Sequence, residues 1–585
     1  MASDQVVEAW VQRSQDPSSQ QYSQTAGIDA SGNVVVGGSW GSDRFTAKYA
    51  AADGSLKWQQ RPVTAPGNPA SVRSLAIMPG GDIMVTGPVT GMAGDQDYST
   101  IRYAGSDGRI LWETFYKGPA GSHDVPAAIV LDAAGNPIVT GTSNNGSAAN
   151  GVEANGNDLY TAKYAAGNGA LLWERRYNGP GNRGDTAAGV AVDALGHVVV
   201  TGTSRADSNG DGLFDNDFYT AKYAASDGAL IWERRYDGLL SVGDLAAAVT
   251  VDPQGNVLVT GSSGGYYTAK YAAADGALLW SRRYQGPGLS SDAASAIAVD
   301  RNGDVIVTGA SASGAPAQDL DYYTAKYAAG DGSLLWEKRY NGPGNGDDRA
   351  ISLAVDASGN VVVTGTSSSL PVAFDTFGDY YTTKYAAADG ALIWEKYYNG
   401  PANGGESASS LALAPNGLLA VTGSSDSDSG TGIRASMATV VYREVPPALS
   451  FAGWVAGFGL YGAAASADAD PDQDGLVNGA EYILGGIPVT PDLTIQPSLS
   501  RPGQTMVLTF FRADASETPD ITLKVDTGTD LVTWPSQMII GATTAASAPG
   551  VTVTENGSGP DLITVSLPSG PEPRRFARLD ISVAP

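Results

Sequence analysis

The sequence contains no cysteine and only two histidines among its 585 residues. The absence of thiols excludes disulfides, thiolate metal sites, cysteine nucleophiles and covalent c-type haem attachment. His123 and His197 fall at positions expected on opposite faces of the fold, so they cannot share one metal site, and a serine–histidine–aspartate triad is not expected. His123 beside Asp124 stays open as an acid or base. The sequence therefore assigns no catalytic residue and no residue that binds an organic cofactor.

Positive charge is also scarce, with 35 lysines and arginines against 61 acidic residues and a net charge of -26. Such a surface repels phosphate backbones, so nucleic acid is not an expected partner. Neutral glycans, cations and basic protein surfaces stay open as partners. No apolar run is long enough to cross a bilayer, and the most apolar stretch is the Gly- and Ala-rich segment 449–465.

What the sequence has in abundance is a tryptophan-centred repeat. Its fullest copies contain Asp-Tyr-Tyr-Thr-Ala-Lys-Tyr, then Asp-Gly-Ala-Leu-Leu-Trp-Glu-Arg-Arg-Tyr, then Gly-Asn-Val-Val-Val-Thr-Gly. Four strand signals separated by turn signals in each copy predict one blade of a β-propeller. In the third copy we expect strands at 127–131, 137–140, 159–164 and 170–177. The tryptophans of the repeat, spaced 48 to 61 residues apart, are Trp10, Trp58, Trp112, Trp173, Trp232, Trp280, Trp336 and Trp394.

The two ends of the repeat region predict how the ring closes. The last copy, residues 407–443, has no tryptophan strand, whereas residues 6–13 have a tryptophan strand without a blade. We therefore predict an all-β, eight-bladed propeller in which the N-terminal strand completes the last blade, and this closure removes the exposed edge that an open array would present. A rod-like solenoid is the alternative, but it leaves the Trp10 strand unexplained.

Features present in every blade are expected to be architectural, and departures from the repeat are expected to carry function. The tryptophans should pack between blades, and Lys163 and its equivalents should pair with Glu174 and its equivalents on the adjacent strand. The departures gather in the connections between second and third strands and in the links between blades, which emerge on one face. Ligand contacts are predicted there for Phe214, Phe374 and Phe377.

Residues 470–481 match the twelve-position calcium loop D-x-D-x-D-G-x5-E. Short carboxylates at alternate positions converge on a hard cation, Gly475 permits the sharp turn, and the last glutamate can bind through both oxygens. The alternative is a solvated acidic linker. The expected calcium ligands are Asp470, Asp472, Asp474, the carbonyl of Leu476, Asn478 and Glu481.

A second, weaker calcium loop occupies the fourth repeat. It has carboxylates at calcium-loop spacing but Phe218 at the twelfth position, where a carboxylate is normally found. If it binds calcium, the ion would stiffen a long connection on the face expected to carry function. Its candidate ligands are Asp207, Asn209, Asp211 and Asp215.

We predict three domains: the propeller (1–445), a short helical linker with the calcium loop (446–490) and a β-sandwich (491–585). Sandwich strands are expected at 505–512, 520–525, 551–554, 562–567 and 576–583. No signal-peptide pattern precedes the first strand, so we expect the mature form of an exported protein, located outside the cell or on its surface.

The repeat Ala-Ala-Asp-Gly-Ala-Leu-Leu-Trp-Glu resembles that of quinoprotein-like eight-bladed propellers, and Val-Asp-x-x-Gly-Asn-Val-Val-Val-Thr-Gly resembles repeats of secreted bacterial propellers. Quinoprotein dehydrogenases add a calcium-bound quinone cofactor, a catalytic acid and often vicinal cysteines; this chain has no cysteine, and its cofactor ligands cannot be placed. The loop 470–481 resembles dockerin and EF-hand loops, and the loop that starts at Asp207 resembles a thrombospondin type 3 segment. In the C-terminal module, Asp530-Leu-Val-Thr-Trp534 and Arg574-Arg-Phe-Ala-Arg-Leu resemble the C-terminal modules of secreted proteins from Verrucomicrobia-like bacteria.

Our leading hypothesis is an exported, calcium-stabilised binding or surface-scaffold protein that presents propeller loops to a glycan or an extracellular protein. An enzymatic role is the less favoured expectation. The first alternative is a carbohydrate-active hydrolase or lyase that uses a carboxylate pair on the loop-rich face. The second is a structural subunit of an extracellular assembly, with self-association through the C-terminal domain.

Overall fold

A computed structural model of the chain divides into two compact units, residues 4–444 and residues 445–585, which are described separately. The structure describes residues 6–14, 19–62, 69–91, 94–119, 123–144, 156–206, 215–238, 243–288, 292–314, 319–368, 378–402, 404–426, 435–444, 451, 454–455, 458, 460, 464, 466–473, 476–485, 487, 496–500, 505–513, 521–529, 534–541, 543–556, 559–567 and 576–583.

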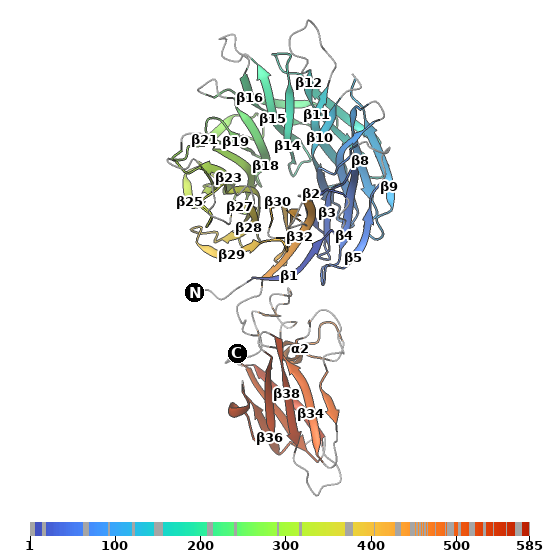
Figure 1. Cartoon of the computed structure of the whole chain (residues 1–585), viewed down its shortest axis with the longest axis vertical. Coiled ribbons are helices and arrows are strands. Elements are labelled where there is room, and N and C mark those ends of the chain that lie inside the picture. The colour runs from blue at the N-terminus through green and yellow to red at the C-terminus, as the bar shows by residue number, and fades with distance from the viewer. Residues whose placement is uncertain are drawn as a thin grey trace. The chain divides into compact units, whose positions relative to one another are not determined.

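The first unit is a β-propeller whose four-stranded antiparallel sheets surround a common centre (Figure 1). Its described residues form eight such sheets. Seven of these sheets are each made of four strands that are consecutive in the sequence. The first three are β2 (Gln21–Ile28), β3 (Val34–Trp40), β4 (Asp43–Tyr49) and β5 (Leu56–Gln60); β6 (Ser74–Ile77), β7 (Ile83–Thr90), β8 (Gln96–Tyr103) and β9 (Ile110–Tyr116); and β10 (Asp124–Leu131), β11 (Pro137–Asn144), β12 (Asn157–Tyr164) and β13 (Leu171–Tyr177). The next four are β14 (Asp185–Val192), β15 (Val198–Ala206), β16 (Asp215–Tyr223) and β17 (Leu230–Tyr236); β18 (Leu245–Val251), β19 (Val257–Ser262), β20 (Tyr266–Tyr271) and β21 (Leu278–Tyr284); β22 (Ala293–Val299), β23 (Val305–Ala312), β24 (Leu320–Tyr327) and β25 (Leu334–Tyr340); and β26 (Arg349–Val355), β27 (Val361–Ser368), β28 (Gly378–Tyr385) and β29 (Leu392–Tyr398).

The eighth sheet joins the two ends of the propeller, as the sequence predicts. It contains β30 (Glu406–Leu413), β31 (Leu418–Asp426), β32 (Ala435–Glu444) and, as its outer strand, β1 (Val6–Arg13). β1 pairs antiparallel with β32, from Val6 opposite Glu444 to Arg13 opposite Ala438. Pairing the N-terminal strand in this way places both ends of the propeller region in one blade and closes the ring.

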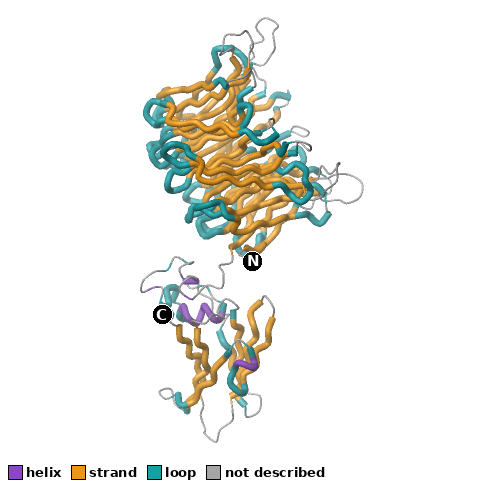
Figure 2. Tube along the Cα trace, turned by 90° about the vertical axis from the view of Figure 1, so that its left-hand side faces the viewer, coloured by secondary structure: helices purple, strands orange, loops and turns teal. Residues whose placement is uncertain are grey.

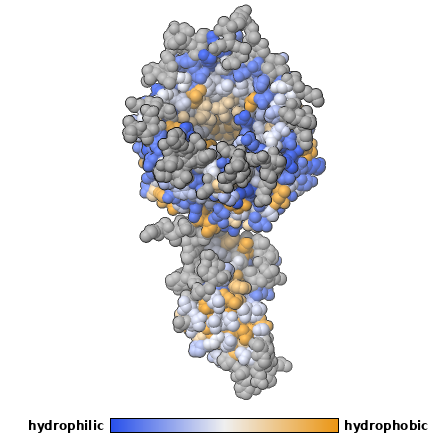
Figure 3. Space-filling model, in the orientation of Figure 1, coloured by the Kyte–Doolittle hydropathy of each residue, from blue (hydrophilic) through white to orange (hydrophobic). Residues whose placement is uncertain are grey.

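The strands run between two faces of the propeller (Figure 2). One face, here called the turn face, bears the hairpins that join first to second and third to fourth strands. The other, the loop face, bears the connections between second and third strands and the links between blades. The middle strands are buried on both sides, as in β23 and β24, whereas the innermost strands are half-buried and give the centre of the ring an apolar colour in Figure 3.

The tryptophan of each blade packs against the next blade and donates a hydrogen bond to it. Trp173 is 5% exposed, and its indole N–H donates to the Ala225 carbonyl in the following blade. Lys163 donates to the same carbonyl oxygen at 2.9 Å. The glycine three residues further along approaches the indole ring: a Cβ on Gly228 would lie 2.7 Å from Trp173 Cε3, and its φ of +68° also favours glycine. The predicted inter-blade role of the tryptophans is therefore confirmed.

The expected pairing of Lys163 with Glu174 is wrong. Lys163 lies opposite Trp173 in the β12–β13 register, and Glu174 lies opposite Ala162, so the two side chains point to opposite faces of the sheet. Lys163 instead forms an ion pair with Asp132, at 2.8 Å, at the end of the first strand. Glu174 accepts a hydrogen bond from the Tyr160 hydroxyl.

The described residues of the second unit form a β-sandwich and the short helix α2. Its core joins residues of both sheets, such as Ile563 and Val525, to Ile483 of the helix, so the helix packs within the sandwich core. The sequence did not predict β33 or β36. The elements are α2 (Asn478–Leu484), a 3-10 turn (Thr544–Ala546), a sheet of β33 (Ser498–Ser500), β34 (Met506–Arg512), β38 (Gly559–Leu567) and β37 (Val551–Asn556), and a sheet of β36 (Ser536–Ile540), β35 (Ile521–Gly528) and β39 (Phe576–Val583).

Candidate functional site

The loop face is held in place by buried acids at the start of the innermost strands. Asp348, which is fully buried, accepts hydrogen bonds from the Gly342 N–H in the blade link at 2.5 Å and from the Ser368 N–H at the root of the next connection at 3.0 Å. One carboxylate thus ties together the two kinds of loop that form this face. The same glycine N–H bond is accepted by Asp124, Asp185, Asp244 and Asp292.

Burial changes the acidity of these carboxyl groups. It raises the pKa of Asp185 and of Asp348 to about 6, against the opposing effect of the serine and glycine hydrogen bonds. In the eighth blade Glu406 takes the place of the aspartate, and burial raises its pKa to about 7. Its Oε1 accepts a hydrogen bond from the Ser425 hydroxyl at 3.1 Å. These acids are 0 to 3% exposed, so they hold the loops and do not meet a bound polymer directly.

A second set of side chains links neighbouring blades just below the loop face. Arg235 on β17 donates to Asp217 of its own blade at 2.8 Å and to the Tyr177 hydroxyl of the preceding blade at 2.8 Å. Arg13 on β1 donates likewise to the Tyr398 hydroxyl, so the N-terminal strand reproduces the contact of an ordinary outer strand. Tyr397 replaces the arginine in β29, where its hydroxyl contacts that of Tyr340.

Three carboxylates gather where the weaker calcium loop meets the propeller. Oxygens of Asp215, Asp217 and Asp237 lie within 4.8 Å of one another. Arg235 neutralises one of the three charges, and Asp215 Oδ1 is buried with no hydrogen-bond partner in the described part of the chain. Oxygen ligands at this spacing suit a hard divalent cation. The other predicted ligands, Asp207, Asn209 and Asp211, lie outside the described residues.

The stronger calcium loop lies in the second unit, at the start of α2. Asn478, at the ninth loop position, is fully buried, and its amide nitrogen donates to the Ala464 and Ser466 carbonyls at 2.9 Å. Its Oδ1 has no hydrogen-bond partner among the residues that the structure describes. Glu481, at the closing position, is 1% exposed, while Asp470 and Asp472 are half-buried. A buried acceptor and buried closing carboxylate fit a bound cation; the predicted ligand Asp474 lies outside the described residues.

The predicted ligand contacts Phe214, Phe374 and Phe377 all lie outside the described residues. Sequence reasoning also missed the buried acids of the loop face. Their signal is a glycine in the blade link followed six residues later by an acid, as in Gly179 and Asp185. That spacing recurs in most blades and could have revealed them.

Comparisons with known proteins agree with the repeat. A family model described as outer membrane protein assembly factor BamB matches residues 157–321. The matched residues run from β12 to β24 of the propeller. No curated protein matches the chain.

Three solved structures illustrate the likeness. The crystal structure of BamB from Moraxella catarrhalis is 13% identical, with 75% of this chain and 99% of that chain covered and a TM-score of 0.45. A quinohemoprotein alcohol dehydrogenase from Pseudomonas putida HK5 is 12% identical, covering 76% and 77% with a TM-score of 0.45. Sqt1 from Chaetomium thermophilum is 12% identical, covering 76% and 100% with a TM-score of 0.46. Among the described residues, no helix has the length and apolar character needed to span a membrane.

Proposed function

We propose that the chain is an exported binding or surface-scaffold protein whose loop face contacts a glycan or an extracellular protein. The observation that carries this proposal is the way in which the loops are held. In five blades the acid at or just before the start of the innermost strand accepts a hydrogen bond from a glycine of the blade link and so fastens that link, as Asp348 does with Gly342. A face with fastened loops is preorganised for binding, which lowers the entropy lost when a partner is bound.

The same observation favours binding over hydrolysis. A glycosidase needs two carboxyl groups roughly 5 to 10 Å apart that both reach the substrate. Asp185, Asp244 and Asp292 are at most 3% exposed and accept hydrogen bonds from backbone N–H groups. Catalysis by these acids would require the loops that they hold to open. A non-enzymatic role follows as the proposal.

Calcium is proposed as a stabilising ion at two places. Residues 470–481 supply a complete ligand pattern, and the buried Oδ1 of Asn478 supports it. The carboxylates of Asp215, Asp217 and Asp237 support a second ion beside the connection that begins at Asp207. Calcium would be held there by carboxylate, amide and carbonyl oxygens, and it would restrain loops without taking part in a reaction.

The family model that matches residues 157–321 supports the scaffold part of the proposal, since its name describes an assembly factor. The net charge of -26 supports a neutral glycan or a basic protein surface as the partner. An extracellular or cell-surface location, with attachment through the C-terminal sandwich, completes the proposal.

The test is to pass the full chain over a panel of polysaccharides and a glycan array, with calcium and again with chelator, and to measure retention and released sugar together. Retention without sugar release is the expected result, with weaker retention in chelator. Sugar release would contradict the non-enzymatic proposal. If the chain is neither retained nor active, the glycan is excluded and self-association, measured by light scattering, decides whether the chain is an assembly subunit.

A further inference from the structure

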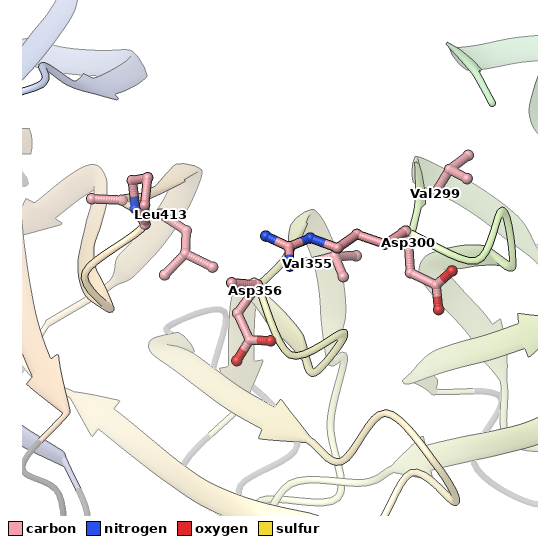
Figure 4. Close-up of a pocket in the computed structure, with 9 residues that line it drawn as sticks. Val299, Asp300, Val355, Asp356 and Leu413 are labelled. Atoms are coloured by element: carbon pink, nitrogen blue, oxygen red, sulfur yellow. The ribbon is translucent and has the colours of Figure 1, made fainter. Parts of the chain in front are cut away.

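A pocket of about 260 Å³ lies on the turn face of the propeller, away from the loops discussed above. It is formed where three consecutive innermost strands, β22, β26 and β30, end. Val299, Val355 and Leu413 are the last residues of these strands, and Figure 4 shows them with Asp300 and Asp356 around the pocket. All three aliphatic side chains are half-buried, so the pocket has apolar walls that solvent can reach.

Two departures from the repeat meet at this pocket. The first is Arg301, an exposed residue at the second position of a first hairpin turn. The second is Ala414, which replaces the aspartate that begins most of these turns and makes this side of the pocket apolar. At the position of Arg301 the other seven turns have only alanine or proline: Ala30, Pro79, Ala133, Ala194, Pro253, Ala357 and Pro415.

Arg301 is the basic residue among those that line the pocket. The lining acids already have partners: Asp300 pairs with Lys326 at 2.8 Å and Asp356 with Lys384 at 2.8 Å, and these lysines are shared with Asp304 and Glu444. Arg301 forms no ion pair within the part of the chain that the structure describes. A guanidinium group beside apolar walls is suited to an acid that carries an apolar body.

We propose that this pocket binds a small monoanionic carboxylate with an aliphatic body, either a free aliphatic acid or the C-terminal carboxylate of a peptide that ends in an apolar residue. Arg301 forms the charge-assisted hydrogen bonds to the carboxylate, because its planar donors match the two oxygens. Val299, Val355 and Leu413 contact the aliphatic part. A dianion such as phosphate is disfavoured, because the lining offers one basic side chain, Arg301, beside the two carboxylates of Asp300 and Asp356.

The test measures binding to the full chain by isothermal titration calorimetry and ligand-observed NMR. The probes are hexanoate and uncharged 1-hexanol, and then an N-acetylated Ala-Ala-Leu peptide with a free C-terminus and the same peptide as the C-terminal amide. We expect the charged member of at least one pair to bind about tenfold or more tightly than its uncharged partner. Which pair binds more tightly identifies the source of the carboxylate.

Variants tie the binding to the pocket. Arg301→Gln should weaken binding of the charged probe by about tenfold or more, because it removes the charge and keeps most of the side-chain length. Ala357→Trp, at an exposed lining position, should block the pocket without disturbing the core. Arg349→Gln on the loop face is the matched control and should bind like the unaltered chain. Equal binding by the unaltered chain and Arg301→Gln, or no binding of either charged probe, would overturn the proposal.

Discussion

The indole N–H of Trp394 donates to the carboxylate of Glu444 at 3.0 Å. In the other seven blades the equivalent tryptophan donates to a backbone carbonyl in the third-to-fourth turn of the next blade, as Trp336 does to Ala387. The eighth blade has no such turn, because its outer strand is β1 and comes from the other end of the chain. Glu444 therefore supplies the acceptor that ring closure removes, and it also pairs with Lys384.

Replacing Glu444 should weaken the last inter-blade contact. Glu444→Ala leaves the Trp394 N–H without its acceptor and Lys384 with one partner fewer, so we expect a loss of about 1–3 kcal/mol in the free energy of unfolding. Glu444→Gln should recover part of the loss, because the amide oxygen can accept the indole hydrogen bond. Urea unfolding followed by tryptophan fluorescence measures both. Arg349→Ala removes an exposed ion pair with Asp347 and should cost less than about 0.5 kcal/mol; an equal loss in both alanine variants would contradict the role given to Glu444.

The turn glycines that contact the tryptophans should be intolerant of a Cβ. Gly228→Ala combines a φ of +68° with a contact of 2.7 Å to Trp173, so we expect a loss of about 2–4 kcal/mol. Gly167→Ala is the control in the equivalent turn of the preceding blade, where no atom lies within 4 Å of the new Cβ. It should be neutral or slightly stabilising. Thermal unfolding of the two variants separates the predictions, and similar midpoints would show that the close approach is relaxed in solution.

Glu406 should make the propeller less stable as the pH rises. Burial raises its pKa from 4.5 to about 7, so between these values the folded state keeps a proton that the unfolded chain has released. Unfolding becomes easier as pH increases through this window. Glu406→Gln should therefore be more stable than the unaltered chain by roughly 1–3 kcal/mol at pH 8, and the difference should disappear near pH 4.

Asp132→Asn is the matched control for this pH dependence. Burial acts to raise the pKa of Asp132, but hydrogen bonds from Lys163 and Asn136 outweigh it, and the pKa is lowered. The carboxylate thus stabilises the fold at neutral pH, and this contribution is lost as the pH falls below about 3.8, so the variant should be destabilised at pH 7. Unfolding curves from pH 4 to pH 8 test both variants, and a pH profile unchanged by Glu406→Gln would contradict the assignment.

The repeat made much of this fold predictable, because the same strand and turn signals recur in each blade. The pairing of β1 with β32 could be predicted from Trp10 alone. The strand around Trp10 has the pattern of an outer strand, and the last repeat is the copy that lacks an outer strand. The ion-pair partners of individual side chains were not predictable, because they depend on the register of the strands. Lys163 on β12 pairs with Asp132 in the turn after β10, and not with Glu174 on the neighbouring strand β13. The turn-face pocket was missed because Arg301 is unusual only when all eight turns are aligned.

The calcium loop 470–481 predicts a metal-dependent stability of the second unit. Adding calcium to the chelator-treated chain should raise its unfolding midpoint, with a gain of about 2.7 kcal/mol at a hundredfold excess over the dissociation constant. Asp470→Asn with Glu481→Gln should abolish the gain. Asp468→Asn, an exposed acid just before the loop, should leave it intact. Differential scanning calorimetry measures the shift, and a gain that survives in the double variant would place the ion elsewhere.

The proposal that the loop face binds the partner is tested most directly by hydrogen–deuterium exchange of the full chain, with and without the polysaccharide or protein that it retains. The account predicts slower exchange on binding in the blade links, such as residues 178–182 and 341–345, with no change in the hairpins of the turn face. Protection confined to the turn-face hairpins, such as residues 132–136 and 300–304, would contradict it.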